Sequence, residues 1–292
     1  MGTARGATAD GGPVALDLGG RRYDLTSRCL VMGIVNRTPD SFYDKGAYFA
    51  LDDSLRLAEG HVAAGADLLD VGGVKAGPGA EVSLDEELER VVPAVEALSR
   101  RFDVPISVDT WRSEVAEACY AAGAVLGNDI SGFADPRYLD VAARAGAAVV
   151  ATHIRLAPRV PDPEPSYPGD DVVGAVEAFL SDRLASALRA GIPRTRVVLD
   201  AGLDLGKTAS HSLELLRASA RLAGLGQPLL LSASNKTFLG ALLGLEIGER
   251  RDASLAAAAL GTARGVRLVR VHDVQGTRRV VDAVGAIVAA GR

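Results

Sequence analysis

Acidic and amide side chains in this chain follow runs of apolar residues, where they could bind a polar ligand. Asp109 ends the segment at 104–109, and Asn128 and Asp200 stand near the ends of two later segments of the same kind. A carboxylate accepts hydrogen bonds and an amide both accepts and donates them, so together they could bind a nitrogen-rich heterocycle. Plainer roles stay open, because Asp109 could cap the helix expected near Trp111 and Asn128 could belong to a turn.

Three basic residues occupy positions from which they could bind an anion. Arg270 and His272 alternate about the end of one apolar segment, so their side chains point the same way. Two such groups suit a phosphate or a pyrophosphate. Lys236 opens an expected helix, where its ammonium and the helix dipole could meet an anion. The alternatives are that Arg270 pairs with a structural carboxylate, that His272 packs in the core, and that Lys236 is a solvated surface residue.

Metal-binding signals in the sequence are weak, because no set of His and Cys residues clusters at ligand spacing. A hard cation such as Mg2+ could bridge a pyrophosphate and the amide oxygen of Asn36 while keeping several waters. His61 and His211 fall on expected helices, and we predict them at the surface or at helix ends.

Strands alternating with helices must bring these scattered residues together. From Cys29 onward, eight strand-like segments alternate with amphipathic segments, which predicts a closed (β/α)8 TIM barrel. Strand after strand ends in a hydrogen-bonding residue, whereas an open sheet would gather its polar ends at one switch point. The expected strands are 29–36, 67–72, 104–109, 124–130, 147–153, 196–201, 228–233 and 267–272. The expected helices include 51–64, 85–101, 111–122, 171–190, 210–224 and 275–290.

Two further segments complete the predicted architecture. Residues 14–25 are typical of a short β-hairpin, which could plug the bottom of the barrel. The Pro-rich stretch at 155–171 predicts a long, stiff loop over the barrel mouth. We assign residues 1–12 to a disordered N-terminus and residues 13–292 to a single barrel domain.

The composition excludes several classes of function. The net charge is −5, which argues against nonspecific nucleic-acid binding because that needs a basic face. No stretch approaches the roughly 18 apolar residues of a membrane span. The two cysteines, Cys29 and Cys119, suit neither a metal site nor a disulfide framework, so a reduced, cytoplasmic environment is the default expectation.

Several motifs, in chain order, closely resemble those of the dihydropteroate synthase family, whose members join a pterin pyrophosphate to para-aminobenzoate. The resemblance extends over about residues 30 to 290, and linked motifs on the expected elements make it highly specific. The motifs are Gly33–Phe42, Asp70–Gly73, Ser107–Thr110, Asn128–Gly132, Leu199–Asp200 with Gly206–Thr208, Ser234–Gly240 and Arg270–Val274.

The resemblance implies a role for each matching residue. The pterin would be bound by Asp109, Asn128, Asp200 and Lys236. The pyrophosphate would be held by Arg270, His272 and Asn36, with Mg2+ as the cofactor. In the family, the pterin CH2–O bond ionises to expel pyrophosphate, and the amine of para-aminobenzoate attacks the resulting cation. The resemblance also implies binding of sulfa-like analogues and a homodimer formed through the last helices.

The loops of this sequence depart from the family pattern. After Gly73 the family has Glu-Ser-Thr-Arg-Pro-Gly, whereas this chain has Val74, Lys75, Ala76 and Gly77 before its Pro-Gly. A small apolar residue of the first loop has become Arg37. The family motif Asp-Pro-Gly-x-Gly-Phe-Gly-Lys reads Asp200-Ala201-Gly202-Leu203-Asp204-Leu205-Gly206-Lys207, the Arg of Ser-Arg-Lys is Asn235, and the Met-His-Met region reads Ala151-Thr152-His153-Ile154.

These departures predict a divergent paralogue with a weakened pterin and pyrophosphate pocket and little or no synthase activity. Losing one transition-state contact typically costs ~3 kcal/mol, so several losses in one closing apparatus would be nearly disabling. One alternative is an active synthase in folate biosynthesis in which Arg37 and Lys75 replace the lost charges. Two others are a pterin-binding enzyme similar to methyltetrahydrofolate–corrinoid methyltransferases and a noncatalytic regulatory binding protein.

Overall fold

The computed structural model describes residues 14–36 and 47–290, so Arg37 and the segment expected to be a disordered N-terminus lie outside the described residues. Eight parallel strands form a closed barrel in the order β10-β3-β4-β5-β6-β7-β8-β9, which confirms the predicted architecture. Each expected strand is present. The barrel strands are β3 (Leu30–Asn36), β4 (Leu68–Gly72), β5 (Ile106–Asp109), β6 (Leu126–Asp129), β7 (Ala148–Thr152), β8 (Val197–Asp200), β9 (Leu229–Leu231) and β10 (Val266–Val271).

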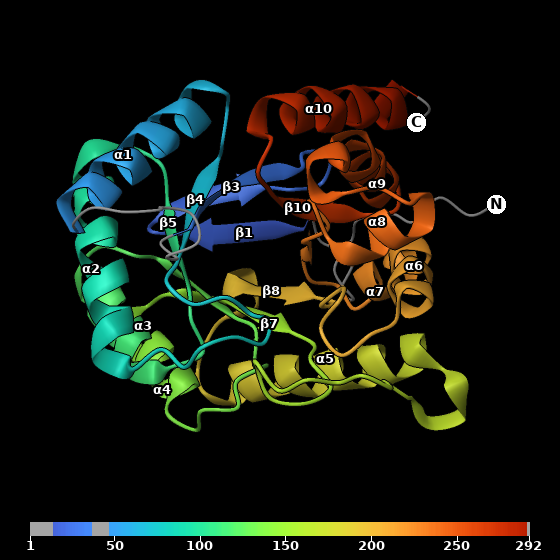
Figure 1. Cartoon of the computed structure of the whole chain (residues 1–292), viewed down its shortest axis with the longest axis horizontal. Coiled ribbons are helices and arrows are strands. Elements are labelled where there is room, and N and C mark those ends of the chain that lie inside the picture. Colours follow the sequence, from blue (N-terminus) through green and yellow to red (C-terminus); the bar gives the residue numbers. More distant parts are fainter. Residues whose placement is uncertain (1–13, 37–46, 291–292) are drawn as a thin grey trace.

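Helices surround the barrel and lie over the outer faces of its strands (Figure 1). Their bounds are α1 (Ala47–Ala63), α2 (Leu84–Arg101), α3 (Ser113–Ala121), α4 (Tyr138–Ala145), α5 (Val172–Arg189), α6 (Ala209–Arg217), α7 (Ser219–Ala223), α8 (Thr237–Leu243), α9 (Arg251–Ala263) and α10 (Val274–Ala290). Within the described parts of the chain, no helix is long and apolar enough to cross a membrane.

The segment expected as one helix at 210–224 is two helices, and this is the main difference from the prediction. The backbone turns at Ala218, where ψ is 5°. The Ser219 hydroxyl then donates to the carbonyl of Leu216 at 2.8 Å. A serine that bonds to nearby backbone competes with helical hydrogen bonding, which explains a break at this position.

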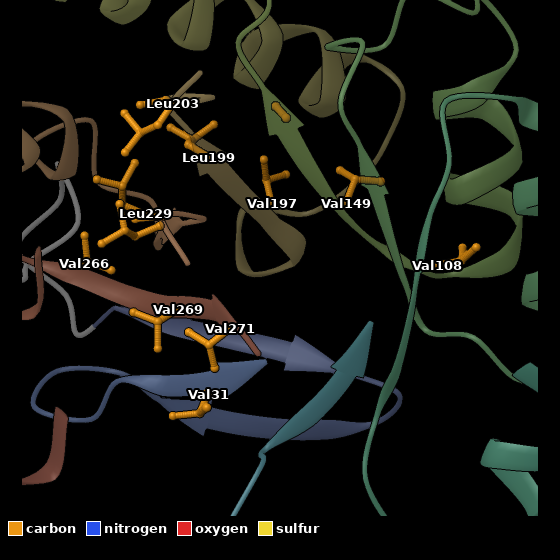
Figure 2. Packing of buried hydrophobic residues seen from close by; sticks show 14 of the residues in the cluster. Val31, Val108, Val149, Val197, Leu199, Leu203, Leu229, Val266, Val269 and Val271 are labelled. Carbon is orange, nitrogen blue, oxygen red and sulfur yellow. The ribbon is translucent and has the colours of Figure 1, made fainter. Parts of the chain in front are cut away.

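The outward-facing side chains of the strands pack against the helices as one apolar layer. Branched residues dominate it, including Val31, Val149 and Val269, each no more than 1% exposed. Figure 2 shows such residues projecting from several neighbouring strands of the barrel wall. Burial of this layer fixes which face of each strand turns toward the barrel axis, because successive side chains alternate.

The inward-facing side chains form a second apolar cluster, which the N-terminal hairpin closes. Strands β1 (Ala15–Leu18) and β2 (Arg21–Asp24) pair antiparallel, with Leu16 opposite Tyr23. The hairpin contributes the buried residues Leu16, Leu18 and Leu25 to this cluster. The barrel contributes Leu30, Met32, Leu68, Leu126, Ala148, Val150, Val198, Leu230 and Leu268. The predicted hairpin and its plugging role are therefore confirmed.

Truncating this plug should destabilise the whole domain. Leu16 is completely buried, so Leu16→Ala removes apolar contacts and leaves a cavity, at a cost of about 2–5 kcal/mol in the free energy of unfolding. Chemical denaturation monitored by circular dichroism would measure the change. Arg22→Ala in the same hairpin is the control, because that side chain is 65% exposed and its loss should alter stability by less than about 0.5 kcal/mol. A similar small effect for both variants would contradict the plug.

Candidate functional site

Polar residues replace apolar ones on the inward row where the strands reach the barrel mouth. Strand alternation places Asp70 two residues beyond Leu68, Asn128 two beyond Leu126, and Asp200 two beyond Val198. Parallel pairing also sets Asp109 opposite Asn128 on neighbouring strands, and Thr152 opposite Asp200. The mouth therefore gathers carboxylates and amides from strands that are distant in sequence.

A guanidinium crosses the barrel mouth and binds two carboxylates. Arg270 donates from Nε to Asp70 Oδ2 at 2.6 Å and from Nη2 to Asp109 Oδ2 at 2.8 Å. Asp70 is completely buried and also accepts from Ser107 Oγ at 2.5 Å and Asn128 Nδ2 at 3.2 Å. Arg270 thus pairs with structural carboxylates, which was the alternative to its binding an anion. Asp70 was noted in the sequence only as one polar strand end among several, without a partner.

The network holds more negative than positive charge. Burial raises the pKa of Asp109 to about 7, because Arg270 offsets only part of the desolvation and Asp70 adds repulsion. Burial also opposes the charge of Arg270, but the two carboxylates outweigh it and raise the pKa of the guanidinium. Arg270 therefore stays cationic, while near neutral pH Asp109 can hold or release a proton toward a ligand.

Asp109 does not act as a helix cap, and Asn128 does not serve a turn, although the sequence allowed both roles. Asp109 does not cap the next helix, since the N–H of Ser113 at the start of α3 donates instead to Asp135 Oδ2 at 2.9 Å. Asn128 donates into the network, and it is the adjacent Asp129 that serves the turn. Asp129 accepts from the N–H groups of Ser131 and Phe133 at 2.6 and 2.9 Å.

Two further predicted site residues lie together beside the network. Asp200 is 4% exposed, accepts from the N–H of Gly202 at 2.8 Å, and has a pKa raised by burial. Lys236 donates from Nζ to the carbonyl of Leu203 at 2.7 Å, and burial lowers its pKa. Lys236 is therefore a partly buried residue held against the loop after β8, and not a solvated surface lysine.

His272 and Asn36 stand at strand ends outside the hydrogen-bonded network of Arg270. His272 is exposed, with Nδ1 at 3.0 Å from Ser234 Oγ, so it does not pack in the core. Asn36 ends β3 and is partly buried. The part of the chain that the structure describes contains no group of three His, Cys, Asp or Glu residues arranged for a metal ion. A lone amide oxygen fits only an ion such as Mg2+, whose other ligands come from phosphate and water.

A buried lysine–histidine pair escaped the sequence analysis. Lys207 Nζ lies 2.9 Å from His153 Nδ1, and it also donates to the carbonyls of Leu205 at 3.0 Å and His153 at 3.3 Å. Burial and the neighbouring ammonium lower the pKa of His153 to about 3, so its neutral ring accepts this hydrogen bond. Burial also lowers the pKa of Lys207, to about 7. Three acceptors make this lysine a tie between the loops after β7 and β8.

The prediction that His61 lies at the surface is wrong, although the residue does lie near a helix end. It sits near the end of α1 but is only 6% exposed, with Nε2 3.0 Å from the carbonyl of Ile34. Gly33 makes room, since a side chain there would lie 3.0 Å from the His61 ring. His211, in contrast, completes a capping box with Thr208 at the start of α6, as expected for a helix-end residue.

The Pro-rich segment after β7 lies over the rim as predicted and holds the loop after β4. Arg159 donates its backbone N–H to the carbonyl of Ala76 at 3.2 Å, and its guanidinium binds the carbonyls of Lys75 and Ala80. An ion pair between Arg155 and Asp162 braces the same segment. All three contacts of Arg159 address backbone oxygens, so they need no particular side chain in the loop at 73–83.

The rim loops after β4, β7 and β8 enclose a pocket of about 140 Å³. Pro78 lines it from the first loop, Leu156 and Asp162 from the second, and Asp204 and Lys207 from the third. The pocket is therefore lined by apolar surface and by charged groups of both signs.

Comparisons with known proteins agree with the sequence motifs. A family described as “Pterin binding enzyme” matches residues 32–272. A Mycobacterium tuberculosis protein named Inactive dihydropteroate synthase 2 is 48% identical over 265 residues, which cover 89% of this chain and 83% of that protein. The Escherichia coli dihydropteroate synthase is 41% identical over 257 residues, covering 87% and 90% of the two chains. The Xanthomonas albilineans dihydropteroate synthase solved with 4-aminobenzoic acid superposes with a TM-score of 0.86 at 39% identity, covering 94% of this chain and 98% of that one.

Removing the Arg159 side chain should release the loop after β4. Arg159→Ala deletes two of the three contacts to backbone carbonyls, so amide exchange at residues 74–81 should accelerate by about tenfold, equivalent to losing ~1.4 kcal/mol of local stability. Hydrogen–deuterium exchange with mass spectrometry would measure this. Arg189→Ala, an exposed arginine at the end of α5, is the control and should leave the loop unchanged. Unaltered exchange in Arg159→Ala would show that other contacts hold the loop.

Proposed function

Because this chain belongs to the dihydropteroate synthase family, we propose that its barrel mouth binds a pterin or pterin pyrophosphate and forms dihydropteroate slowly or not at all. The observation that carries the proposal is the unequal preservation of the site. The deep residues match the family, and the structure gathers them at one end of the barrel, whereas the rim loops differ in sequence.

The deep residues suit the polar edge of a pterin. Asp109 and Asp200 offer carboxylate oxygens to the amino and ring N–H groups of an aminopyrimidinone, and Asn128 offers an amide. Lys236 can donate to a ring nitrogen or carbonyl from the opposite side. Because Asp109 can exchange a proton near neutral pH, it can match either an acceptor or a donor on the ligand.

The anion would lie at the exposed side of the same mouth. Arg270 stays cationic, and the ring of His272 beside it is neutral near pH 7, because desolvation and the charge of Arg270 lower its pKa to about 4. Arg270 can therefore offer a pyrophosphate a charge-assisted hydrogen bond and His272 a neutral one. Asn36 would contribute an amide oxygen to a bound Mg2+, which when present neutralises charge on the leaving group. Arg270 is already bound to Asp70 and Asp109, so an anion must compete for it with two carboxylates. Weakened binding of the pyrophosphate follows.

Turnover would be limited by the rim. Ionisation of the pterin CH2–O bond needs charge stabilisation and exclusion of water from the cation that forms. Positions 74–77 lack the carboxylate, hydroxyls and guanidinium that the family has there, and Arg159 holds this loop through its backbone. Lys75, an exposed point charge, does not reproduce a guanidinium fork.

The other readings differ in what they require. An active synthase needs Arg37 and Lys75 to supply the missing charges. A methyltransferase-like enzyme would use the acidic pterin pocket, but Arg270 with His272 fits a pyrophosphate better. A regulatory binding protein would bind the pterin without turnover, and so differs from our proposal only in the role of the complex.

We also propose a cytoplasmic homodimer that binds sulfa-like analogues weakly. Support for a dimer comes from large apolar side chains exposed on and after α8 and on α10, namely Leu242, Leu243, Ile247 and Ile287. The described cysteines Cys29 and Cys119 are both free and buried, as suits a reducing compartment.

Binding should survive where catalysis does not. Isothermal titration calorimetry with 6-hydroxymethyl-7,8-dihydropterin pyrophosphate and Mg2+ should show saturable binding, and Asn128→Ala should weaken it about tenfold by removing a polar contact in the mouth. The same sample with added para-aminobenzoate should form dihydropteroate at no more than about a hundredth of the rate of an active dihydropteroate synthase. That is the loss expected from one missing transition-state contact. Formation of dihydropteroate at the rate of an active dihydropteroate synthase would contradict the proposal.

Restoring the family residues of the second loop should raise whatever synthase rate remains. The double substitution Ala76→Thr and Gly77→Arg reinstates a hydroxyl and a guanidinium, and we expect a gain of about tenfold or more in kcat/KM. The matched double substitution Gly60→Arg and Ala63→Thr on the exposed face of α1 is the control for charge alone, because a Cβ placed at Gly60 meets no atom within 4 Å. No gain over the control would favour the reading in which Arg37 and Lys75 already supply the charges.

A further inference from the structure

Asp204 holds a backbone conformation that favours glycine. Its φ is +66°, in the left-handed region where few residues other than glycine are found, although Asp and Asn tolerate it best. The family motif has glycine at this position of the loop after β8. This chain therefore combines a glycine-type backbone conformation at this position with a charged side chain.

The Asp204 carboxylate is fixed across two loops. Its Oδ2 accepts from the backbone N–H of Thr237 at 2.6 Å and from Thr237 Oγ1 at 2.7 Å. Its own N–H donates to Ser212 Oγ at 3.1 Å. These contacts join the loop after β8 to the start of α8, next to Lys236. The carboxylate therefore cannot turn away from the rim without losing both bonds to Thr237.

Neither hydrogen-bond donor to the Asp204 carboxylate carries a charge. The buried ammonium groups of Lys236 and Lys207 attract its charge, but both also interact with Asp200, and burial lowers their pKa values, that of Lys207 to about 7. Arg159, which lines the same pocket, binds backbone carbonyls. A negative charge thus lines the rim pocket beside the residues assigned to the pterin. Two like charges about 7 Å apart at an effective dielectric constant of about 40 repel enough to change an affinity roughly tenfold.

We propose that Asp204 is a specificity-determining residue whose fixed carboxylate weakens the binding of an anionic second ligand, such as 4-aminobenzoate, in the rim pocket relative to a neutral one. The inference rests on the proposed function in one respect, because it takes the pocket to be where a second ligand would meet a bound pterin. The carboxylate acts by its charge and is not a catalytic residue.

The test compares 4-aminobenzoate with its uncharged counterpart 4-aminobenzamide. Each is titrated by NMR into the full chain saturated with 6-hydroxymethylpterin, for the wild type and for Asp204→Asn. The substitution removes the charge, keeps an acceptor for Thr237 and suits the left-handed backbone. We expect about tenfold tighter binding of 4-aminobenzoate and unchanged binding of 4-aminobenzamide. Asp204→Gly, the family residue, should give the same selective gain.

The control is Asp103→Asn, which removes one negative charge from a side chain that is 93% exposed and precedes β5, at the end of the barrel opposite the mouth. It should change neither affinity. Equal gains for both compounds in Asp204→Asn, no gain for 4-aminobenzoate, or no binding of either compound by any variant would each overturn the inference. Failure to bind 6-hydroxymethylpterin would count against the proposed function instead, and titrations without the pterin would still compare the two compounds.

Discussion

The ion pairs of Arg270 with Asp70 and Asp109 join β10, β4 and β5 across the mouth of the barrel. Removing the guanidinium would leave two carboxylates buried together, and breaking a buried pair in this way costs about 3–5 kcal/mol. The same contact sets the electrostatic character of the site. It places one cation among several carboxylates, so a ligand at the mouth would have to enter an existing charged network.

Much of the architecture could be predicted because side-chain alternation is local. Branched apolar runs ending in a polar residue marked all eight barrel strands, and Gly19-Gly20 marked the hairpin. Properties that depend on partners far along the chain were less accessible. The burial of His61 depends on space left by Gly33 on another element, and the break at Ala218 coincides with a hydrogen bond from the Ser219 hydroxyl to the Leu216 carbonyl.

The candidate site was predicted in the same uneven way. Its residue types and strand ends were visible, but the pairing of Arg270 with Asp70 depends on the register of β10 and β4, which are not neighbours in the barrel. The Lys207–His153 tie joins two loops and has no spacing signature. Contacts to backbone carbonyls, such as those of Arg159, leave no trace in the partner's sequence, because every residue offers the same oxygen.

The rim shows how charged residues can persist without serving a ligand. Lys236 binds the Leu203 carbonyl, Lys207 the carbonyls of His153 and Leu205, and Asp204 the N–H of Thr237. Each of these charged groups hydrogen-bonds to backbone and so orders a loop of the rim. Lys236 and Lys207 match lysines of the family motifs, yet in this chain both also hold the rim loops. A barrel fold and its deep polar residues can therefore be retained while the rim loops after β4, β7 and β8 change in sequence and are held together by contacts to backbone.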